Sequence, residues 1–220
     1  MSSGNRVPLH TAQIIANQFY DLLSDLPGHM TIAGSIRRKK PSIGDIEIVC
    51  LPENRIELLN RLDMLEQDGT IKKALYGDKS RWGDRLRGCI FQRMQVEVTI
   101  ADKDNFGYQL WLRTGPGDKN KFVMTQMIIH KPPVRFGDGY AWHVKYDEDV
   151  AGGFRQLAKL HIPDEWKLYH ILGMREILPW ERTEQAYRRQ IGRSIRHLPQ
   201  DEIKAMYAES NVPVQLSLFD

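Results

Sequence analysis

The sequence predicts an α+β fold, and three observations lead to this prediction. Short segments in which apolar and polar residues alternate, as in half-buried strands, are interspersed with longer segments whose apolar spacing is helical. The chain contains no internal repeat and no low-complexity tract. Its 220 residues are 41% hydrophobic and 27% charged, which is the composition of an ordinary globular protein with ample length for a core.

Helices and strands alternate in the first half of the chain. Pro27 and Gly28 end the first helix, and Pro52 closes the second strand. In the last strand Val96 and Val98 alternate with polar residues, so one face is expected to be buried. The expected elements are a helix over 9–25, strands over 30–33 and 44–51, a helix over 54–66, and strands over 70–75, 88–93 and 95–101.

The second half is expected to be mixed and then helical. Gly115, Pro116 and Gly117 break the helical pattern, and Gly-Asp-Gly at 137–139 predicts a hairpin turn. The expected elements are helices over 106–114 and 119–130, a hairpin over 134–146, a helix over 149–160 and a mostly helical stretch from residue 164. The expected parts of the chain are 1–114, a small domain at 115–164, a helical extension at 165–210 and a tail at 211–220.

Charge and cysteine content limit the class of protein. The formal net charge is only +3, but basic residues cluster, which suits a polyanionic partner. Cys50 and Cys89 lie in apolar, strand-like stretches, so we expect buried free thiols in a reducing compartment. The sequence has no signal-peptide core and no apolar run long enough to span a bilayer. We therefore expect a cytoplasmic monomer with no membrane partner.

Residues 33–49 are the most informative segment. A Gly34-Ser35 turn is followed by two arginines, and backbone N–H groups, a hydroxyl and guanidinium groups together suit a triphosphate. Asp45 and Glu47 are two residues apart on an expected strand, so both point to the same face. Two converging carboxylates attract Mg²⁺, a hard cation that takes oxygen ligands. A phosphate-binding turn beside a metal-binding pair indicates phosphoryl or nucleotidyl transfer.

This segment resembles the palm domain of the DNA polymerase X family, the polymerases similar to DNA polymerase beta. The resemblance rests on Gly-Ser-x-Arg-Arg at 34–38 followed by Gly-Asp-Ile-Glu at 44–47. Downstream, Gln-Val-Glu-Val at 95–98 occupies the place of the family's third carboxylate strand. Arg-Thr-Gly at 113–115 resembles the segment that opens the family's nucleotide-selecting region.

The resemblance implies a nucleotidyltransferase palm, a mixed β-sheet with helices on one face, joined to a small α/β domain and a helical tail. It also implies two-metal transfer of a nucleotide from a dNTP to a primer 3′-hydroxyl, with two Mg²⁺ ions, or Mn²⁺, as cofactor. The implied catalytic residues and metal ligands are Asp45, Glu47 and Glu97. The residues expected to bind the nucleotide are Gly34, Ser35, Arg38, Gly44, Leu112, Arg113, Thr114, Gly115 and Asn120.

Three departures from the family pattern bear on activity. Glu47 and Glu97 stand where the family usually has Asp, so we expect slower or more Mn²⁺-responsive catalysis. Leu112 and Arg113 replace a Tyr-Phe pair that blocks a ribose 2′-hydroxyl, which leaves the choice between dNTP and rNTP open. The sequence before Met30 is too short for the family's N-terminal lyase domain, so we expect no lyase activity.

A basic cluster near the middle of the palm has two interpretations. It is expected either to contact template or primer phosphates or to form a solvated face. Trp82 within it would stack on a base or pack in the core. The members of the cluster are Lys79, Arg81, Arg85 and Arg87.

The C-terminal tail carries a second motif. It resembles the pentapeptide with which bacterial proteins bind the sliding clamp, since a Gln is followed by Leu and Phe anchors for apolar pockets. Its residues are Gln215, Leu216, Ser217, Leu218 and Phe219. A tail that docks on its own domain is the alternative.

Three functional hypotheses follow from these features. The first is a minimal DNA polymerase that fills short gaps in a primer-template during repair or replication, with a bacterial sliding clamp as tether. The second is a template-independent nucleotidyltransferase that acts on RNA or another acceptor. The third is a clamp-binding adaptor with weak catalysis.

Overall fold

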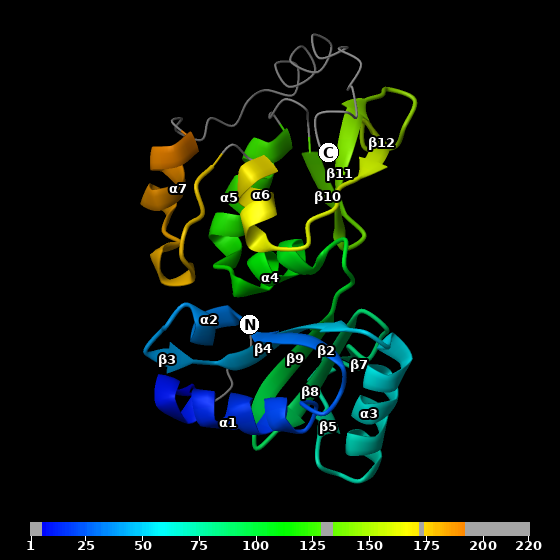
Figure 1. The fold of residues 1–220 in the computed structure, drawn as a ribbon, viewed down its shortest axis with the longest axis vertical. Helices are drawn as coiled ribbons and strands as arrows, with labels where there is room; N and C mark the ends of the chain where they lie inside the picture. Colours follow the sequence, from blue (N-terminus) through cyan, green and yellow to red (C-terminus); the bar gives the residue numbers. More distant parts are fainter. Residues whose placement is uncertain (1–5, 129–133, 172–173, 192–220) are drawn as a thin grey trace.

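The structure, a computed structural model, describes residues 6–128, 134–171 and 174–191. It has the α+β fold that the sequence predicts, with two units stacked along the long axis (Figure 1). The N-terminal unit is a sheet with helices packed on it, and the C-terminal unit combines helices with a small antiparallel sheet. Within these ranges, every helix is too short or too polar to traverse a lipid bilayer.

The N-terminal sheet has five strands in the spatial order β2–β4–β9–β8–β5. Its central pair, β4 and β9, is parallel, and the other pairs are antiparallel. The strands span Gly28–Ile32 (β2), Asp45–Pro52 (β4), Met94–Ile100 (β9), Leu86–Phe91 (β8) and Lys72–Lys73 (β5). Two short ribbons pair β1 (Val7–Pro8) with β3 (Ser42–Ile43) and β6 (Leu75–Tyr76) with β7 (Lys79–Ser80).

The two faces of this sheet have different surroundings. Alternating apolar side chains of β4 and β9 enter the main core, where helices α1 (Leu9–Asp21) and α3 (Arg55–Gln67) cover them. The intervening residues point the other way, and there Val49 packs in a second cluster with residues of helix α4 (Phe106–Thr114). The polar residues of β4 and β9 therefore face the side on which α4 lies.

Local sequence explains how the first helices begin. Pro8 has the extended conformation that precedes α1. The Asn54 side chain caps α3, because its oxygen accepts hydrogen bonds from the backbone N–H groups of Ile56 and Glu57. A single-turn helix α2 (Gly34–Arg37) follows β2 and lies against β4. The Gly-Ser turn of the sequence is therefore the start of α2.

The C-terminal unit is built around its own core. Its helices pack against the antiparallel sheet β10–β11–β12, and the large side chains of Trp111, Tyr169 and Tyr187 are fully buried. The elements are α5 (Gly117–Ile128), β10 (Val134–Gly137), β11 (Tyr140–Tyr146), β12 (Phe154–Lys159), α6 (Glu165–Ile171), a 3₁₀ helix at Pro179–Glu181 and α7 (Glu184–Ile191).

One expected element is wrong. Residues 154–159 form strand β12 where we expected a helix over 149–160. Gly152 and Gly153 have φ angles of 87° and 74°, and they turn the chain so that β12 pairs antiparallel with β11. Apolar residues three apart imitate a helical pattern in this segment, and the pairing with β11 decides the outcome. Most of the other described elements lie close to their expected bounds.

The two cysteines lie inside the N-terminal core. Cys50 and Cys89 are both buried free thiols, which confirms that part of the prediction. Burial raises the pKa of each thiol to about 12, so both remain protonated near neutral pH. A protonated thiol is a poor nucleophile and a poor metal ligand, so these residues contribute packing.

Helix α4 contributes to both cores. The side chains that pack in the cluster with Val49 are Phe106 and Leu110, and those that enter the C-terminal core are Tyr108 and Trp111. Gly107 allows the chain before α6 to approach the helix, and its N–H donates a hydrogen bond to the Ile162 carbonyl oxygen at 2.9 Å. A Cβ atom at Gly107 would lie 2.1 Å from the carbonyl group of Asp164.

Replacing Gly107 by Ala would therefore force a methyl group into the backbone of Asp164. We expect Gly107→Ala to lower the free energy of unfolding by about 2–3 kcal/mol, measured by urea denaturation. Gly117→Ala is the matched control, because a Cβ there meets no atom within 4 Å. Ala is favoured over Gly in a helix by about 0.5–1 kcal/mol, so this variant should be as stable as the parent or more so. Equal stability of the two variants would contradict the prediction.

Candidate active site

Three carboxylates lie on the polar face of the N-terminal sheet. Asp45 and Glu47 are two residues apart on β4, and the parallel pairing places Glu47 directly opposite Glu97 on β9. Residues in register on neighbouring strands point to the same side of a sheet. The structure therefore brings the three predicted catalytic residues to one face.

Burial and like charge set the ionisation of the two carboxylates on β4. Burial raises the pKa of Asp45, and the nearby charge of Glu97 adds to the effect. Burial likewise raises the pKa of Glu47 to about 7, with the charge of Asp45 as the second cause. Ionising both groups is costly without a counter-charge, so a divalent cation beside them would be stabilised.

Glu97 is held in a different way. Its Oε1 atom accepts hydrogen bonds from Tyr76 Oη (2.5 Å) and Arg81 Nη1 (3.1 Å), and its Oε2 atom accepts one from Arg113 Nη1 (3.1 Å). Only 7% of Glu97 is exposed, so these partners surround a largely buried charge. Within the part of the chain that the structure describes, no group of three or more His, Cys, Asp or Glu side chains is arranged to hold a metal ion. The acidic pair on β4 is in place, whereas the third carboxylate is paired with arginines.

The backbone of Gly34 lies directly against the carboxylate of Glu47. A Cβ atom at Gly34 would come 2.5 Å from Glu47 Oε2, and the φ angle of 63° is a conformation that also favours glycine. A Cβ atom here would therefore displace the Glu47 carboxylate. The predicted phosphate-binding turn and the acidic pair therefore belong to one site.

Two buried side-chain atoms without hydrogen-bond partners belong to α2 and the residue that follows it. Among the described residues, the buried Ser35 Oγ and Arg38 Nε atoms have no hydrogen-bond partner. Burial lowers the pKa of Arg38, and the charge of Glu47 counteracts this, which places the guanidinium within electrostatic reach of the acidic pair. Buried donors are costly unless they meet an acceptor, so this turn suits a phosphate group.

The segment at the end of α4 meets the same turn. Arg38 Nη1 donates a hydrogen bond to the carbonyl oxygen of Thr114. Gly115 has φ 66° and ψ −158°, a backbone conformation that essentially only glycine adopts, and a Cβ atom there would lie 2.9 Å from that Nη1 atom. The following peptide bond, to Pro116, is cis. The predicted nucleotide-selecting segment therefore contacts the predicted phosphate-binding arginine.

Other residues expected to bind the nucleotide make structural contacts. Asn120 is 2% exposed, and its Nδ2 atom donates to the Leu112 carbonyl oxygen at 2.7 Å, which ties α5 to the end of α4. Leu112 also packs against the C-terminal core. Gly44 precedes β4, where a Cβ atom would meet Arg6 Nη1 at 3.2 Å. Asn120 and Leu112 thus support the segment that contacts the Gly-Ser turn.

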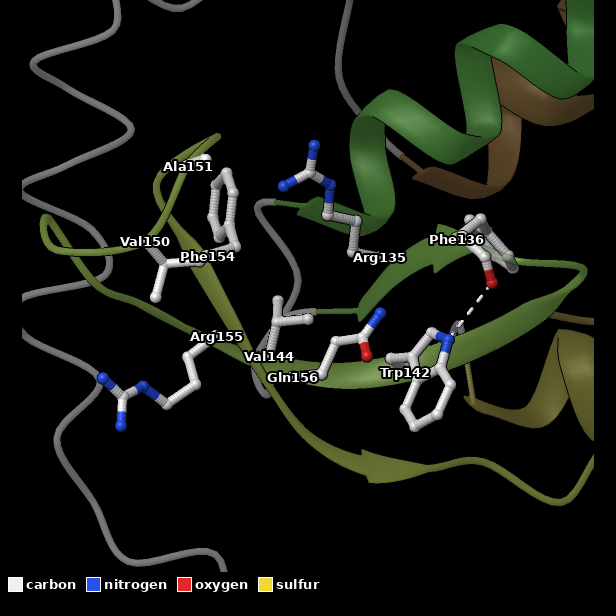
Figure 2. A pocket seen from close by; sticks show the side chains of 10 residues that line it. Arg135, Phe136, Trp142, Val144, Val150, Ala151, Phe154, Arg155 and Gln156 are labelled. Carbon is white, nitrogen blue, oxygen red and sulfur yellow. Dashed lines mark hydrogen bonds between the residues drawn. The ribbon is translucent and has the colours of Figure 1, made fainter.

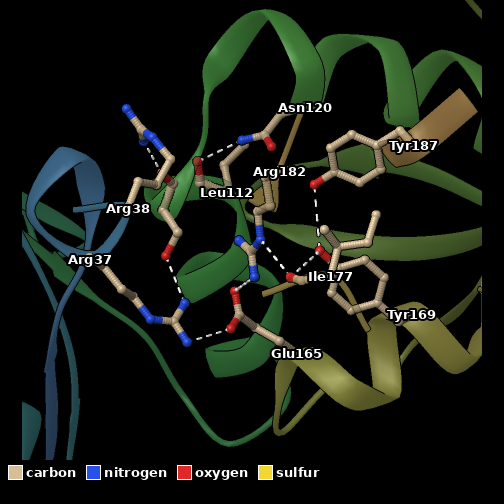
Figure 3. Close-up of polar contacts among 10 residues, drawn as sticks. Arg37, Arg38, Leu112, Asn120, Glu165, Tyr169, Ile177, Arg182 and Tyr187 are labelled. Carbon is tan, nitrogen blue, oxygen red and sulfur yellow. Dashed lines mark hydrogen bonds and ion pairs between the residues drawn. The ribbon is translucent and has the colours of Figure 1, made fainter. Parts of the chain in front are cut away.

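A buried ion-pair triad that the sequence analysis missed joins the two units (Figure 3). The carboxylate of Glu165 accepts hydrogen bonds from Arg37 Nη2 (2.6 Å) and Arg182 Nη2 (2.7 Å). Arg37 also donates to the Thr114 hydroxyl at 2.8 Å. The side chains of Glu165 and Arg182 are 4% and 0% exposed. The sequence offered one signal for this triad. Because adjacent residues of a helix point in different directions, Arg37 and Arg38 could not both face the phosphate site.

The expected DNA-contacting cluster needs one correction. Arg87 is 6% exposed and pairs with Asp63 of α3 at 2.5 Å, so it holds this helix on the sheet and does not face a ligand. Trp82 donates a hydrogen bond from Nε1 to the same carboxylate at 2.8 Å and packs against the main core. Of the two roles expected for Trp82, its contacts are those of core packing. The exposed members of the cluster are Lys79, Arg81 and Arg85.

A separate pocket of about 420 Å³ opens on the C-terminal sheet (Figure 2). The Arg135 guanidinium lies over the Phe154 ring, 4.9 Å from its centroid. Trp142 lines the pocket from β11 and donates from Nε1 to the Gly137 carbonyl oxygen at 3.1 Å. Aromatic rings beside a guanidinium suit a planar or anionic group. None of the described site residues expected from the sequence lines this pocket.

The raised pKa of Glu47 makes stability depend on pH. A carboxyl group whose pKa rises from 4.5 to about 7 on folding holds its proton more tightly in the folded state, so the metal-free protein loses stability as the pH rises through this range. The expected loss is about 3 kcal/mol. Denaturant unfolding without divalent cations should show that Glu47→Gln removes most of this slope, while the exposed-site control Glu53→Gln retains it. An unchanged slope in Glu47→Gln would contradict the prediction.

The Glu165 carboxylate is the shared, buried counter-charge of two guanidinium groups, so removing it should destabilise the protein. Glu165→Gln removes that charge, and we expect a loss of about 3–5 kcal/mol in the free energy of unfolding. Glu184→Gln is the matched control, since Glu184 also pairs with two cationic side chains but is 41% exposed. Exposed pairs contribute about 0–1 kcal/mol. If the two variants unfold at the same urea concentration, the triad has no special role.

Comparisons with known proteins add no relative. No protein-family model matches the chain, and a search of curated proteins finds no match. The polymerase X resemblance therefore stays a prediction from the motifs. The function has to be argued from the acidic pair, the Gly-Ser turn and the segment at the end of α4.

Proposed function

We propose that this chain is a nucleotidyltransferase of the DNA polymerase X type, which adds nucleotides to the 3′-hydroxyl of a DNA primer. One observation carries the proposal: the Gly34 backbone lies against the Glu47 carboxylate. A phosphate-binding turn and a metal-binding acidic pair have to be neighbours if a metal-bound triphosphate is to contact both.

The acidic pair supports a divalent-metal site. Asp45 and Glu47 would hold the ions, and Glu97 is the nearest further carboxylate in register. Burial and mutual repulsion make the first two carboxylates costly to ionise alone, and a cation would relieve that cost. Mg²⁺ or Mn²⁺ bound there would supply positive charge to stabilise the developing negative charge of the displacement.

The protein's own groups would position the substrates. Ser35 Oγ and Arg38 Nε would donate hydrogen bonds to phosphate oxygens, which would satisfy two buried donors. Arg37 would keep the turn in place through its contacts with Thr114 and Glu165. Fixed donors and fixed orientation are the main contributions that a protein makes to phosphoryl transfer.

A DNA primer-template is the proposed acceptor because basic side chains remain exposed on the palm. Lys79, Arg81 and Arg85 are exposed and could meet backbone phosphates, although Arg81 also pairs with Glu97 and Arg85 donates to the Asp138 carbonyl oxygen, and this exposed charge supports short gap filling in repair or replication. Recruitment by a bacterial sliding clamp stays a prediction, since the pentapeptide at 215–219 lies outside the described residues.

Untemplated transfer to RNA or another acceptor is the second candidate. Asn120, which was expected to bind the nucleotide, is buried and donates a hydrogen bond to the Leu112 carbonyl oxygen. A site without this contact has less means to read the incoming nucleotide. The same observation keeps the choice between dNTP and rNTP open.

Incorporation assays separate the candidates. Primed, gapped and blunt DNA are offered with each dNTP or rNTP, in Mg²⁺ and in Mn²⁺. We expect template-matched incorporation, and a loss of about 10³-fold or more in Asp45→Asn, because a carboxylate that holds the ions is removed. Asp68→Asn is the control and should leave the rate unchanged, since the Asp68 carboxylate accepts hydrogen bonds from Thr70 in an exposed turn.

Each other outcome has a definite meaning. Sequence-blind tailing would support the second candidate. If the wild-type protein incorporates no nucleotide with either metal, both enzyme hypotheses are contradicted. The remaining hypothesis is then the clamp-binding adaptor. Equal rates for Asp45→Asn and the wild type would show that the acidic pair is not the site.

A further inference from the structure

We propose that Arg113 is the resident counter-ion of Glu97, and that a divalent cation takes its place when the third carboxylate becomes a metal ligand. This inference rests on the function proposed above. It assigns Arg113 a role that neither the Gly-Ser turn nor the acidic pair requires. Arg113 belongs to the segment that contacts Arg38, so the exchange links the metal site with the phosphate site.

The geometry places Arg113 at the acidic face of the sheet. It is the penultimate residue of α4, and its Nη1 atom lies 3.1 Å from Glu97 Oε2. Its positive charge also lowers the pKa of Glu47, against the larger effects of burial and of Asp45. The Arg113 guanidinium, at the end of α4, therefore acts on two of the three carboxylates of the N-terminal sheet.

Burial distinguishes Arg113 from the other arginine on Glu97. The Arg113 side chain is 23% exposed, whereas that of Arg81 is 51% exposed. Solvent screens an exposed pair more strongly, so Arg113 supplies the larger share of the counter-charge. With its Oε2 atom paired to Arg113 and its Oε1 atom bonded to Tyr76 and Arg81, Glu97 offers no unpaired carboxylate oxygen to a cation.

A released Arg113 has an anionic destination nearby. Among the described residues its buried Nε atom has no hydrogen-bond partner, so its present position leaves one donor unsatisfied. The next residue, Thr114, accepts hydrogen bonds from both Arg37 and Arg38. A nucleoside triphosphate held by Arg38 is thus within reach of the freed guanidinium. Metal uptake at Glu97 and triphosphate binding then favour each other.

Mn²⁺ binding to the full chain, counted by electron paramagnetic resonance, tests the exchange without any turnover. The wild type should bind one Mn²⁺ tightly and a second weakly. Arg113→Leu should bind the second ion about tenfold more tightly, because no guanidinium competes for the carboxylate. Arg113→Lys keeps the charge and should resemble the wild type. A non-hydrolysable dNTP should tighten the second ion more in the wild type than in Arg113→Leu.

Two controls isolate the role of Glu97. The tighter binding of the second ion should vanish when Arg113→Leu is combined with Glu97→Gln, since it acts through this carboxylate. Arg6→Met removes an equal charge that acts on Asp45 and makes no hydrogen bond to Glu97, so it should leave the second ion unchanged. Arg113→Gln serves as a second charge-removing variant if Arg113→Leu fails to fold by circular dichroism.

The inference is overturned if folded Arg113→Leu or Arg113→Gln binds the second ion as the wild type does. It is also overturned if the gain survives Glu97→Gln. Asp45→Asn separates this failure from that of the proposed function. If Asp45→Asn loses the first ion while the Arg113 variants match the wild type, only this inference fails. If Asp45→Asn binds Mn²⁺ as the wild type does, the proposed function fails with it.

Discussion

The close approach of the Gly34 backbone to the Glu47 carboxylate is the constraint on which the rest of the site depends. α2 lies against β4, and the φ angle of 63° at the first residue of this short helix favours glycine. Because α2 lies there, Ser35 and Arg38 are held beside the acidic pair. Under the proposed function, the donors for a phosphate and the ligands for a cation would therefore come from one turn and one strand.

Thr114 is the point at which the two units meet this turn. Its hydroxyl and its carbonyl oxygen each accept a hydrogen bond from one of two adjacent arginines, Arg37 and Arg38. Arg37 also bonds to Glu165, and the same carboxylate accepts a hydrogen bond from Arg182, which directly follows the 3₁₀ helix in the chain. Removing one member of such a buried network leaves the others uncompensated, so the network couples the position of the turn to the packing of the whole unit.

Sequence patterns predicted the parts of the site that are local. Gly34, Asp45 and Glu47 lie in one short segment, and a two-residue spacing on a strand fixes their common face. The pairing that sets Glu97 beside Glu47 involves strands that are distant in the chain, and only a family resemblance pointed to it. Arg182 lies in no periodic pattern, because tertiary packing alone places it. Strand β12 shows the same limit. Its apolar spacing suits a helix, but its pairing with β11 makes the segment a strand.

Helix α4 restricts how the two units can move. One set of its side chains is committed to the cluster with Val49 and another to the C-terminal core, so pulling the units apart would expose apolar surface on one side or the other. Arg113 lies at the C-terminal end of this helix, so any shift of α4 relative to the N-terminal sheet would change the distance between its guanidinium and the carboxylate of Glu97.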